Sequence, residues 1–189
     1  MHTADRGEGA ERRDRDARRS TARPTPDARQ GVKPAAWSLA DIPYHALERH
    51  RLHEDGILLY LLASASFIEI TSDLYTRNLV KFFEDDDEVA GWLRQHWERE
   101  ELQHGAALKR YVETAWPEFD WQAAYRGFFD EYSRGCALER FSETRALELV
   151  SRCVVETGTA SFYGMLADFS PEPVLRLLAS RIRADEIGH

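Results

Sequence analysis

The sequence is poor in cysteine and has no long uninterrupted hydrophobic run. Its 189 residues include only two cysteines, Cys136 and Cys153, too few for a disulfide scaffold and without the ligand spacing of a zinc site. The longest apolar stretch, residues 57–70, contains serines and a glutamate and is too short to span a bilayer. The N-terminus also lacks the apolar core of a signal peptide. We therefore expect a soluble, cytoplasmic protein with no membrane span.

Acidic residues outnumber basic ones beyond the first residues of the chain. The net charge is −8, and residues 1–33 have a balance of +3, which leaves −11 for residues 34–189. An acidic body argues against nucleic-acid binding, because that function needs a basic face. Residues 1–36 are rich in arginine and have no apolar period. We predict that they form a disordered tail, since they cannot bury enough surface to offset the entropy of ordering.

Alternating strand patterns are also missing, and the sequence from Trp37 onward favours helices. Helices are predicted from Tyr44 or His53 to residue 83, over 87–116, 120–133 and 142–169, and from Ser170 onward. The acidic run 84–88 is typical of a helix N-cap and first turn. The last helix is expected to begin at Ser170-Pro171 and to continue to the last residue, His189.

The connections between these helices predict an all-α architecture. The first two long helices are joined by a few residues, as are the last two, and such short links make antiparallel neighbours. About 25 residues with their own short helix separate the two hairpins. This is the pattern of a ferritin-like four-helix bundle over residues 37–189, and we expect it to be truncated within the fourth helix.

Two glutamates and two Glu-x-x-His motifs recur in the same order in both halves. Glu69 and Glu156 each lie within an otherwise apolar helix, where an ionised carboxylate is costly unless a cation meets it. Glu69 precedes Glu101-x-x-His104 by 32 residues, and Glu156 precedes Glu186-x-x-His189 by 30. A spacing of three places Glu and His on one helical face. A di-metal carboxylate bundle uses this inventory of ligands.

The alternative is a plain helical bundle with Glu and His on its surface. Random placement gives about one Glu-x-x-His pair in a chain of this composition. The two motifs therefore gain their weight from the matched spacing and from the buried acid in each preceding helix, since buried acids are rare without partners.

Carboxylate and imidazole ligands suit iron or manganese. We assign Glu69, Glu101 and His104 to one ion, and the other ion to the remaining predicted ligands, Glu156, Glu186 and His189. Glu101 and Glu186 are candidates for bridging both ions, although spacing does not decide which glutamates bridge.

Acidic residues also precede each Glu-x-x-His motif directly. We propose that Glu100 and Asp185 accept the second ring N–H of the histidine in the opposite hairpin. The alternative is that they are solvated surface acids.

Three segments of the chain resemble one known family. Residues 100–108 resemble the second-helix motif of soluble acyl-carrier-protein desaturases, within the ferritin-like superfamily, and residues 182–189 look like their fourth-helix motif. Glu156-Thr157-Gly158-Thr159 is similar to the third-helix segment, in which a threonine follows the ligand glutamate by three. The resemblance implies a di-iron site bridged by Glu101 and Glu186. It also implies that Thr159 assists oxygen activation or proton delivery.

The first functional hypothesis is a non-haem di-iron enzyme that uses O₂ to desaturate or hydroxylate an organic substrate. It implies two iron ions, or a manganese–iron pair, and an external electron donor such as a ferredoxin. The alternatives are a ferroxidase, iron-storage or peroxide-scavenging protein of the ferritin or rubrerythrin type, and a bundle without catalytic function. Assembly size separates them, because a large cage supports storage, whereas a monomer or homodimer supports an oxygenase.

Overall fold

A computed structural model describes residues 36–52, 55–136 and 141–189, all within one compact unit. Every regular element in these ranges is helical and none is a strand, so the all-α prediction is confirmed for the described part of the chain. The predicted disordered tail lies outside the described residues, apart from residue 36.

Three short 3-10 helices precede the long helices: η1 (Leu39–Asp41), η2 (Tyr44–Ala46) and η3 (Arg49–Arg51). The remaining elements are α1 (Gly56–Ile70), α2 (Ser72–Phe82), α3 (Asp87–Trp92), the π-helical turn η4 (Leu93–Trp97), α4 (Glu98–Ala115), α5 (Trp121–Gly135), α6 (Arg145–Phe169) and α7 (Pro173–Glu186).

The first predicted long helix is two helices that meet at Thr71. Helices α1 and α2 are bent by 42° at this break. Thr71 is buried, and its hydroxyl donates to the Phe67 carbonyl oxygen at 2.6 Å. A threonine hydroxyl that bonds the carbonyl four residues earlier often bends a helix. Gly56 is the first residue of α1, and the Asp55 carboxylate caps this helix by accepting from the backbone N–H of Leu58.

The second predicted helix is interrupted by the π-turn η4. The predicted cap is confirmed, because the Asp86 carboxylate accepts from the backbone N–H of Val89 at 3.1 Å. Helix α4 ends at Ala115, as expected from the proline at position 117. The π-turn lies one turn before Glu101, and π-turns are frequent next to functional sites.

Both predicted limits of the last helix are wrong. Helix α7 begins at Pro173, because the buried carboxylate of Glu172 is its cap and accepts from the backbone N–H of Leu175 at 2.7 Å. The same carboxylate accepts from the Tyr111 hydroxyl at 2.9 Å. Helix α7 ends at Glu186, after which the backbone N–H groups of residues 188 and 189 both donate to the Asp185 carbonyl oxygen. The last residue therefore lies in a turn.

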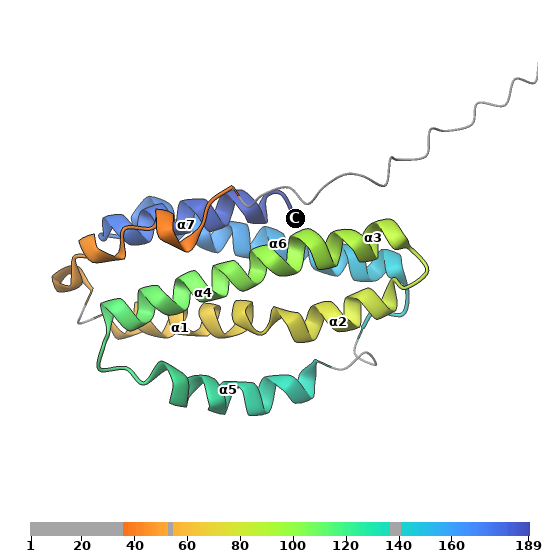
Figure 1. Ribbon diagram of the computed structural model, residues 1–189, viewed down its shortest axis with the longest axis horizontal. Helices are drawn as coiled ribbons and strands as arrows, with labels where there is room; N and C mark the ends of the chain where they lie inside the picture. Colours follow the sequence, from red (N-terminus) through yellow and green to blue (C-terminus); the bar gives the residue numbers. More distant parts are fainter. Residues whose placement is uncertain (1–35, 53–54, 137–140) are drawn as a thin grey trace, which may run out of the picture. The chain divides into compact units, whose positions relative to one another are not determined.

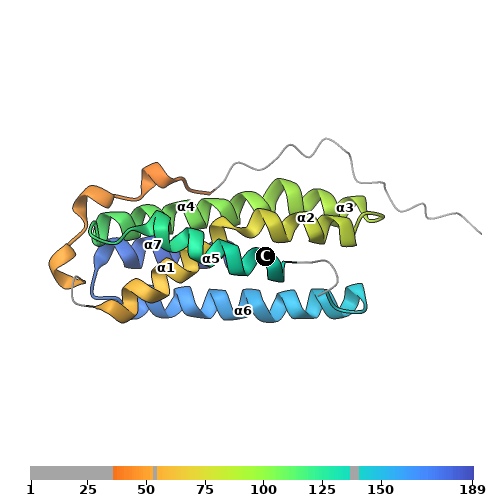
Figure 2. The same ribbon diagram turned by 90° about the horizontal axis from the view of Figure 1, so that it is seen from below.

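The helices pack as two principal pairs. Helix α1 lies along α4 and α6 lies along α7, which is the pairing predicted for two hairpins (Figures 1 and 2). Helix α5 lies beside α1 and α4. The main apolar core is formed by side chains of α1, α4, α6 and α7, among them Leu62, Leu108, Leu175 and Leu178. A second cluster joins α2, α3 and η4 and includes Leu79, Phe83 and Trp97.

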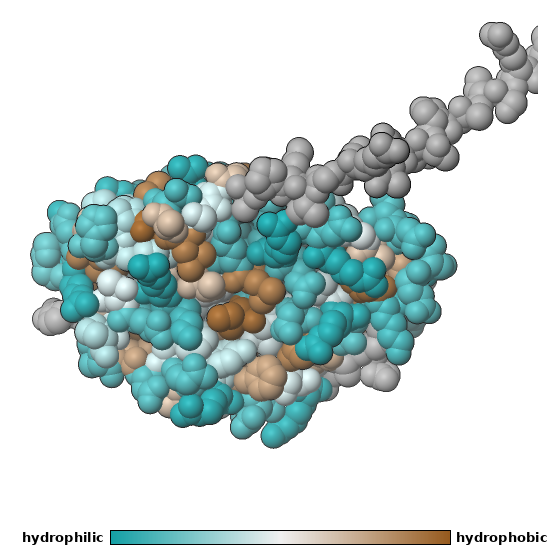
Figure 3. Space-filling model, viewed as in Figure 1, coloured by the Kyte–Doolittle hydropathy of each residue, from teal (hydrophilic) through white to brown (hydrophobic). Residues whose placement is uncertain are grey.

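The face seen in Figure 3 is mostly hydrophilic, with apolar side chains in small separate areas. Among the described helices, no single one has the length and apolar character needed to cross a membrane. Helices α1 and α2 reach that length and composition only together, across their bend.

Candidate metal centre

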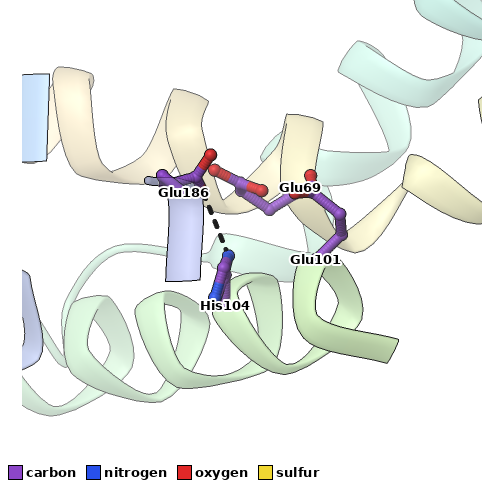
Figure 4. A group of neighbouring side chains, drawn as sticks. All are labelled: Glu69, Glu101, His104 and Glu186. Atoms are coloured by element: carbon purple, nitrogen blue, oxygen red, sulfur yellow. Dashed lines mark ion pairs between the residues drawn. The ribbon is translucent and has the colours of Figure 1, made fainter. Parts of the chain in front are cut away.

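The structure brings the six predicted ligands into two overlapping groups. Each group contains four side chains whose ligand atoms all lie within 4.8 Å of one another. The first group, drawn in Figure 4, is Glu69, Glu101, His104 and Glu186. The second is Glu101, Glu156, Glu186 and His189. Glu101 and Glu186, the two candidates for bridging, are the members that both groups share.

Helices far apart in the sequence supply these side chains. Glu69 comes from α1, Glu156 from α6 and Glu186 from α7, and α4 contributes both Glu101 and His104. Glu69, Glu101 and Glu186 are buried, and Glu156 is half-buried, so each of these helices presents its ligand toward the interior. Only His189 lies outside a helix, in the turn that follows α7.

The two imidazole rings face the shared carboxylates. His104 Nδ1 lies 3.2 Å from a Glu186 oxygen, and His189 Nδ1 lies 3.3 Å from a Glu101 oxygen. A Glu156 oxygen is 3.5 Å from the same nitrogen of His189. The two rings are stacked with their centroids 6.1 Å apart. The same nitrogen of each ring therefore points toward the carboxylates.

Several ligand atoms of this cluster are buried without a hydrogen-bond partner. They are Glu101 Oε1, His104 Nδ1, both carboxylate oxygens of Glu186, and His189 Nδ1. The distances between the histidine Nδ1 atoms and the carboxylate oxygens are short enough for hydrogen bonds. The relative orientation of these groups, however, is not that of a donor and an acceptor. A buried polar atom without a partner is costly. Atoms that converge on a common point without bonding to one another fit a bound cation, and four carboxylates match the charge of two divalent ions.

The outward nitrogen of each imidazole contacts an acid from the opposite helix pair. His104 Nε2 lies 3.0 Å from the Asp185 carboxylate, and His189 Nε2 lies 3.1 Å from the Glu100 carboxylate. These are the two contacts proposed from the sequence. Each acid fixes the orientation of a ring, so that its Nδ1 faces the cluster.

Sequence reasoning missed Trp37 as a partner of this arrangement. Its indole N–H donates to the Asp185 carboxylate at 2.7 Å, and its ring stacks on His104 with an angle of 3° between the planes. Trp37 is 148 residues from Asp185 in the chain. No spacing rule connects residues in an irregular segment with a helix so distant, so no sequence signal predicts this contact.

Tyr163 is a second residue that the sequence reasoning missed. Its side chain is fully buried, and its hydroxyl donates to Glu69 Oε1 at 2.6 Å. Burial and the neighbouring Glu69 raise the pKa of Tyr163 well above its usual range, so the phenol keeps its proton. Tyr163 follows Glu156 by seven residues and therefore lies on the same face of α6. That spacing could have revealed it.

The carboxylates of the cluster have unequal acidities. Burial, reinforced by the negative charges of Glu101 and Glu186, raises the pKa of Glu69 well above its usual range. Burial also raises the pKa of Glu156. Glu186 is buried too, but its close contacts with His104 and His189 outweigh its burial and lower its pKa to about 2. The shifts differ in sign because both imidazoles contact Glu186 whereas Glu69 faces a phenol and other carboxylates.

The pKa values of both histidines are raised, which favours the charged form of each ring. Burial alone would lower the pKa of His104, but its contacts with Asp185 and Glu186 outweigh burial and raise the pKa to about 9. For His189, contacts with the cluster carboxylates likewise outweigh burial and raise the pKa to about 12. The acids around both rings therefore favour their charged, imidazolium form.

A cavity of about 710 Å³ reaches the cluster from one side. Most of its wall is apolar or aromatic and comes from α2, α3, η4 and α6, including Phe83, Trp92, Trp97, Leu149 and Ala160. Glu156, Glu186 and His189 belong to the same wall. The volume falls within the range of small-molecule sites. An apolar ligand in this cavity would lie against the second group of the metal centre.

The structure places the two threonines of α6 differently. Thr157 lines the cavity, whereas Thr159 is not among the described residues of its wall. Thr159 is half-buried, and its hydroxyl donates to the Val155 carbonyl oxygen at 2.7 Å. Its role in oxygen chemistry stays a prediction.

Comparison of the chain with protein-family models, curated proteins and solved structures gave no match.

Proposed function

We propose that the chain is a ferritin-like helical bundle that binds two iron ions, or one manganese and one iron, and uses O₂ to oxidise an apolar organic substrate. The observation that carries the proposal is the pair of overlapping ligand groups that share Glu101 and Glu186. Two groups of possible ligands that share carboxylates fit two adjacent cations better than they fit a single cation.

Each predicted residue has a place in this proposal. Glu69, Glu101 and His104 would hold the first ion and Glu156, Glu186 and His189 the second, and Glu101 and Glu186 belong to both groups of possible ligands. Asp185 and Glu100 hold the histidine rings in place from outside. The hydroxyl of Tyr163 donates a hydrogen bond to Glu69 Oε1, and the other oxygen of Glu69 would then bind the metal.

When bound, two ferrous ions supply the electrons that reduce O₂. In a hydroxylation, one oxygen atom enters a C–H bond of the substrate and the other leaves as water, with two electrons from an external donor such as a ferredoxin and two protons from solvent. A desaturation removes two hydrogen atoms from the substrate. Together with the same two donor electrons and two protons, they reduce O₂ to two water molecules. The apolar cavity wall keeps bulk water away from the reacting carbon.

The cavity favours this oxidative function over iron storage. A storage site needs a route for hydrated cations, whereas the wall opposite Glu156, formed by α2, α3 and η4, is mostly apolar or aromatic. Within the wall, Ala160 leaves open space one turn beyond Glu156. We therefore infer that the space beside the metals holds an organic molecule.

The test is anaerobic loading with ferrous iron followed by exposure to O₂, observed by absorption and Mössbauer spectroscopy. We expect about two irons per chain and a coupled diferric signal, by analogy with the two-metal sites that proteins use. Glu101→Ala and Glu156→Ala should abolish the coupled signal. Glu113→Gln, which changes an exposed glutamate of the same helix α4, is the matched control and should bind iron normally. One iron per chain, or none, would contradict the proposal.

A second variant separates oxidation of an organic substrate from simple iron oxidation. Ala160→Phe should fill the cavity beside the metals without removing a ligand. For an oxygenase, this variant should still form the diferric signal but should lose the turnover of small apolar substrates that the unchanged protein shows. A protein that assembles into a large cage, and that oxidises iron without any organic turnover, would instead be a ferroxidase or storage protein.

A further inference from the structure

The cavity beside the metal centre has an apolar interior and polar groups at its exposed edge. The buried part of its wall includes Leu79, Phe83, Leu93 and Trp97. The exposed part includes three polar residues of α6 and α7, which we call the polar rim: Thr157, Ser161 and Arg183. This combination suits a ligand with an apolar body and one polar end.

Arg183 is the member of the polar rim that can donate hydrogen bonds to such a ligand. Among the described residues, the ion pairs of α6 and α7 join Arg152 to Glu148 and the histidines to the acids of the cluster, and none includes Arg183. The hydroxyls of Thr157 and Ser161 donate to carbonyl oxygens of α6 at 2.6 Å and 2.7 Å, so their protons are already used. The guanidinium of Arg183 is therefore the cationic group of the rim.

Gly164 lets this arginine lie against α6. A Cβ atom built on Gly164 would lie 3.2 Å from Nε of Arg183, closer than side chains usually pack, and 3.5 Å from Cζ. A glycine inside a helix costs about 1 kcal/mol relative to alanine. An arginine that only complemented the C-terminal end of α7 would not need a glycine beneath it. The glycine therefore indicates that the position of the guanidinium matters, and not only its charge.

The guanidinium and the metal centre lie along the same face of α6. Glu156, Ala160 and Gly164 follow one another at intervals of four residues. At 1.5 Å per residue, Glu156 and Gly164 are about 12 Å apart along the helix axis. Ala160 lines the cavity between them. A ligand held by one end at Arg183 would therefore pass Ala160 and place an apolar carbon beside Glu156.

The other charges of the cavity wall have partners or a favourable place in a helix. Nε of Arg152 lies 3.4 Å from the buried carboxylate of Glu148. The carboxylates of the metal centre would be neutralised by the proposed ions. Glu88 lies in the first turn of α3, where the helix N–H groups favour a negative charge. An anionic ligand end would neutralise Arg183 as well, whereas a neutral or cationic end would not.

We propose that the substrate of the metal centre is an apolar carboxylic acid whose free carboxylate binds Arg183. A planar guanidinium can donate two parallel hydrogen bonds to a carboxylate, which fixes the direction of the ligand. A carboxyl group joined to a carrier has no charge and would not form this ion pair. The apolar body lies along the inner wall, against Phe83 and Trp97. Oxidation of this acid rests on the proposed function, whereas its binding does not.

The test compares three ligands with the same tail: decanoate, decanamide and decylammonium. Their affinities for the full chain, loaded anaerobically with ferrous iron and freed of unbound metal, are measured by isothermal titration calorimetry. We expect decanoate to bind roughly 10-fold more tightly than decanamide or better, the usual contribution of a hydrogen-bonded ion pair. Arg183→Gln should remove this preference and leave decanamide binding unchanged. Arg181→Gln, which changes an exposed arginine of the same helix, is the matched control and should keep the preference.

A second measurement locates the ligand in the cavity. Cys153 is exposed and belongs to the cavity wall. In a chain that carries Cys136→Ser, bound decanoate should slow the reaction of Cys153 with N-ethylmaleimide. The same decanoate concentration should protect Cys153 less when Arg183→Gln is added. Full reactivity of Cys153 at saturating decanoate would place the ligand elsewhere and overturn the proposal.

Two results of the calorimetry would also overturn it. A preference for decanoate that survives Arg183→Gln would mean that the carboxylate binds iron or another group. Tighter binding of decylammonium would assign the charged end to an acid such as Glu88. The iron content of the same samples separates this inference from the proposed function. Chains with two irons and no preference for decanoate would contradict this inference alone, whereas a preference in chains that bind no iron would contradict the proposed function alone.

Discussion

The imidazole of His104 and the carboxylate of Asp185 lie 3.0 Å apart, although 81 residues separate them in the chain. Asp185 also accepts the indole N–H of Trp37 at 2.7 Å. The carboxylate is therefore held from two directions, and it holds the His104 ring with Nδ1 toward the metal centre.

Replacement of Asp185 by asparagine should weaken iron binding at the first group of ligands. The amide has no charge to stabilise the ring N–H, and loss of such outer partners typically costs 10- to 100-fold in metal affinity. The measurement is an anaerobic titration with ferrous iron. Trp37→Phe removes the indole N–H and part of the ring that stacks on His104 but leaves the Asp185 carboxylate in place, and should have a smaller effect. Unchanged affinity in Asp185→Asn would show that this contact does not position the ring.

Tyr163→Phe should destabilise the metal-free protein more than the metal-loaded one. The change leaves a fully buried oxygen of Glu69 without its donor, and such a loss costs about 1–3 kcal/mol. A cation bound by Glu69 would offset part of that cost. The comparison is the free energy of unfolding in denaturant, with and without ferrous iron under anaerobic conditions. Equal losses in both forms would argue that Glu69 does not bind metal.

Metal loading should release protons near neutral pH. Both nitrogens of His104 and of His189 face carboxylates, and these contacts raise their pKa values to about 9 and about 12. Because a metal needs the neutral ring, each imidazolium must lose a proton when the ion binds. A pH-stat titration at pH 7 with ferrous iron should detect this release, and iron affinity should increase with pH.

The same shifts predict how the metal-free protein responds to pH. A histidine has a pKa of about 6.5 in the unfolded protein. If its pKa is higher in the folded protein, it stabilises the folded state, and this stabilisation is complete below about pH 6.5. For His104, this stabilisation should disappear as the pH rises through about 9. Thermal unfolding of metal-free protein between pH 6 and 10 should show the decline, and His104→Gln should lessen it.

Gly105→Ala should disturb the metal centre by separating two helices. A Cβ atom at Gly105 would overlap the backbone of Ile70, the residue after Glu69. The two backbones must move apart, and overpacking of this kind costs about 1–3 kcal/mol. We expect a lower melting temperature and weaker iron binding. Gly127→Ala in α5, where a Cβ meets nothing within 4 Å, is the control and should stabilise the helix by up to about 1 kcal/mol.

Much of the helical order could be predicted from local sequence. The Asp86 cap and the end of α4 before Pro117 follow from interactions within a few residues. The limits of α7 could not be predicted in this way. Glu172 caps that helix while it accepts the hydroxyl of Tyr111, a contact across 61 residues that favours Glu172 over Ser170 as the start. The bend at Thr71 was missed because the sequence does not show how a threonine hydroxyl is used.

The sequence by itself determined the helical class of the described chain and the inventory of acids and histidines, because the helical period places residues three or four apart on one face. The tertiary structure alone decided that Glu101 and Glu186 belong to both ligand groups, that Tyr163 bonds Glu69, and that Trp37 bonds Asp185. Those relationships depend on the distance and rotation between helices that are remote in the chain. Packing of the whole core sets both quantities, and no local pattern encodes them.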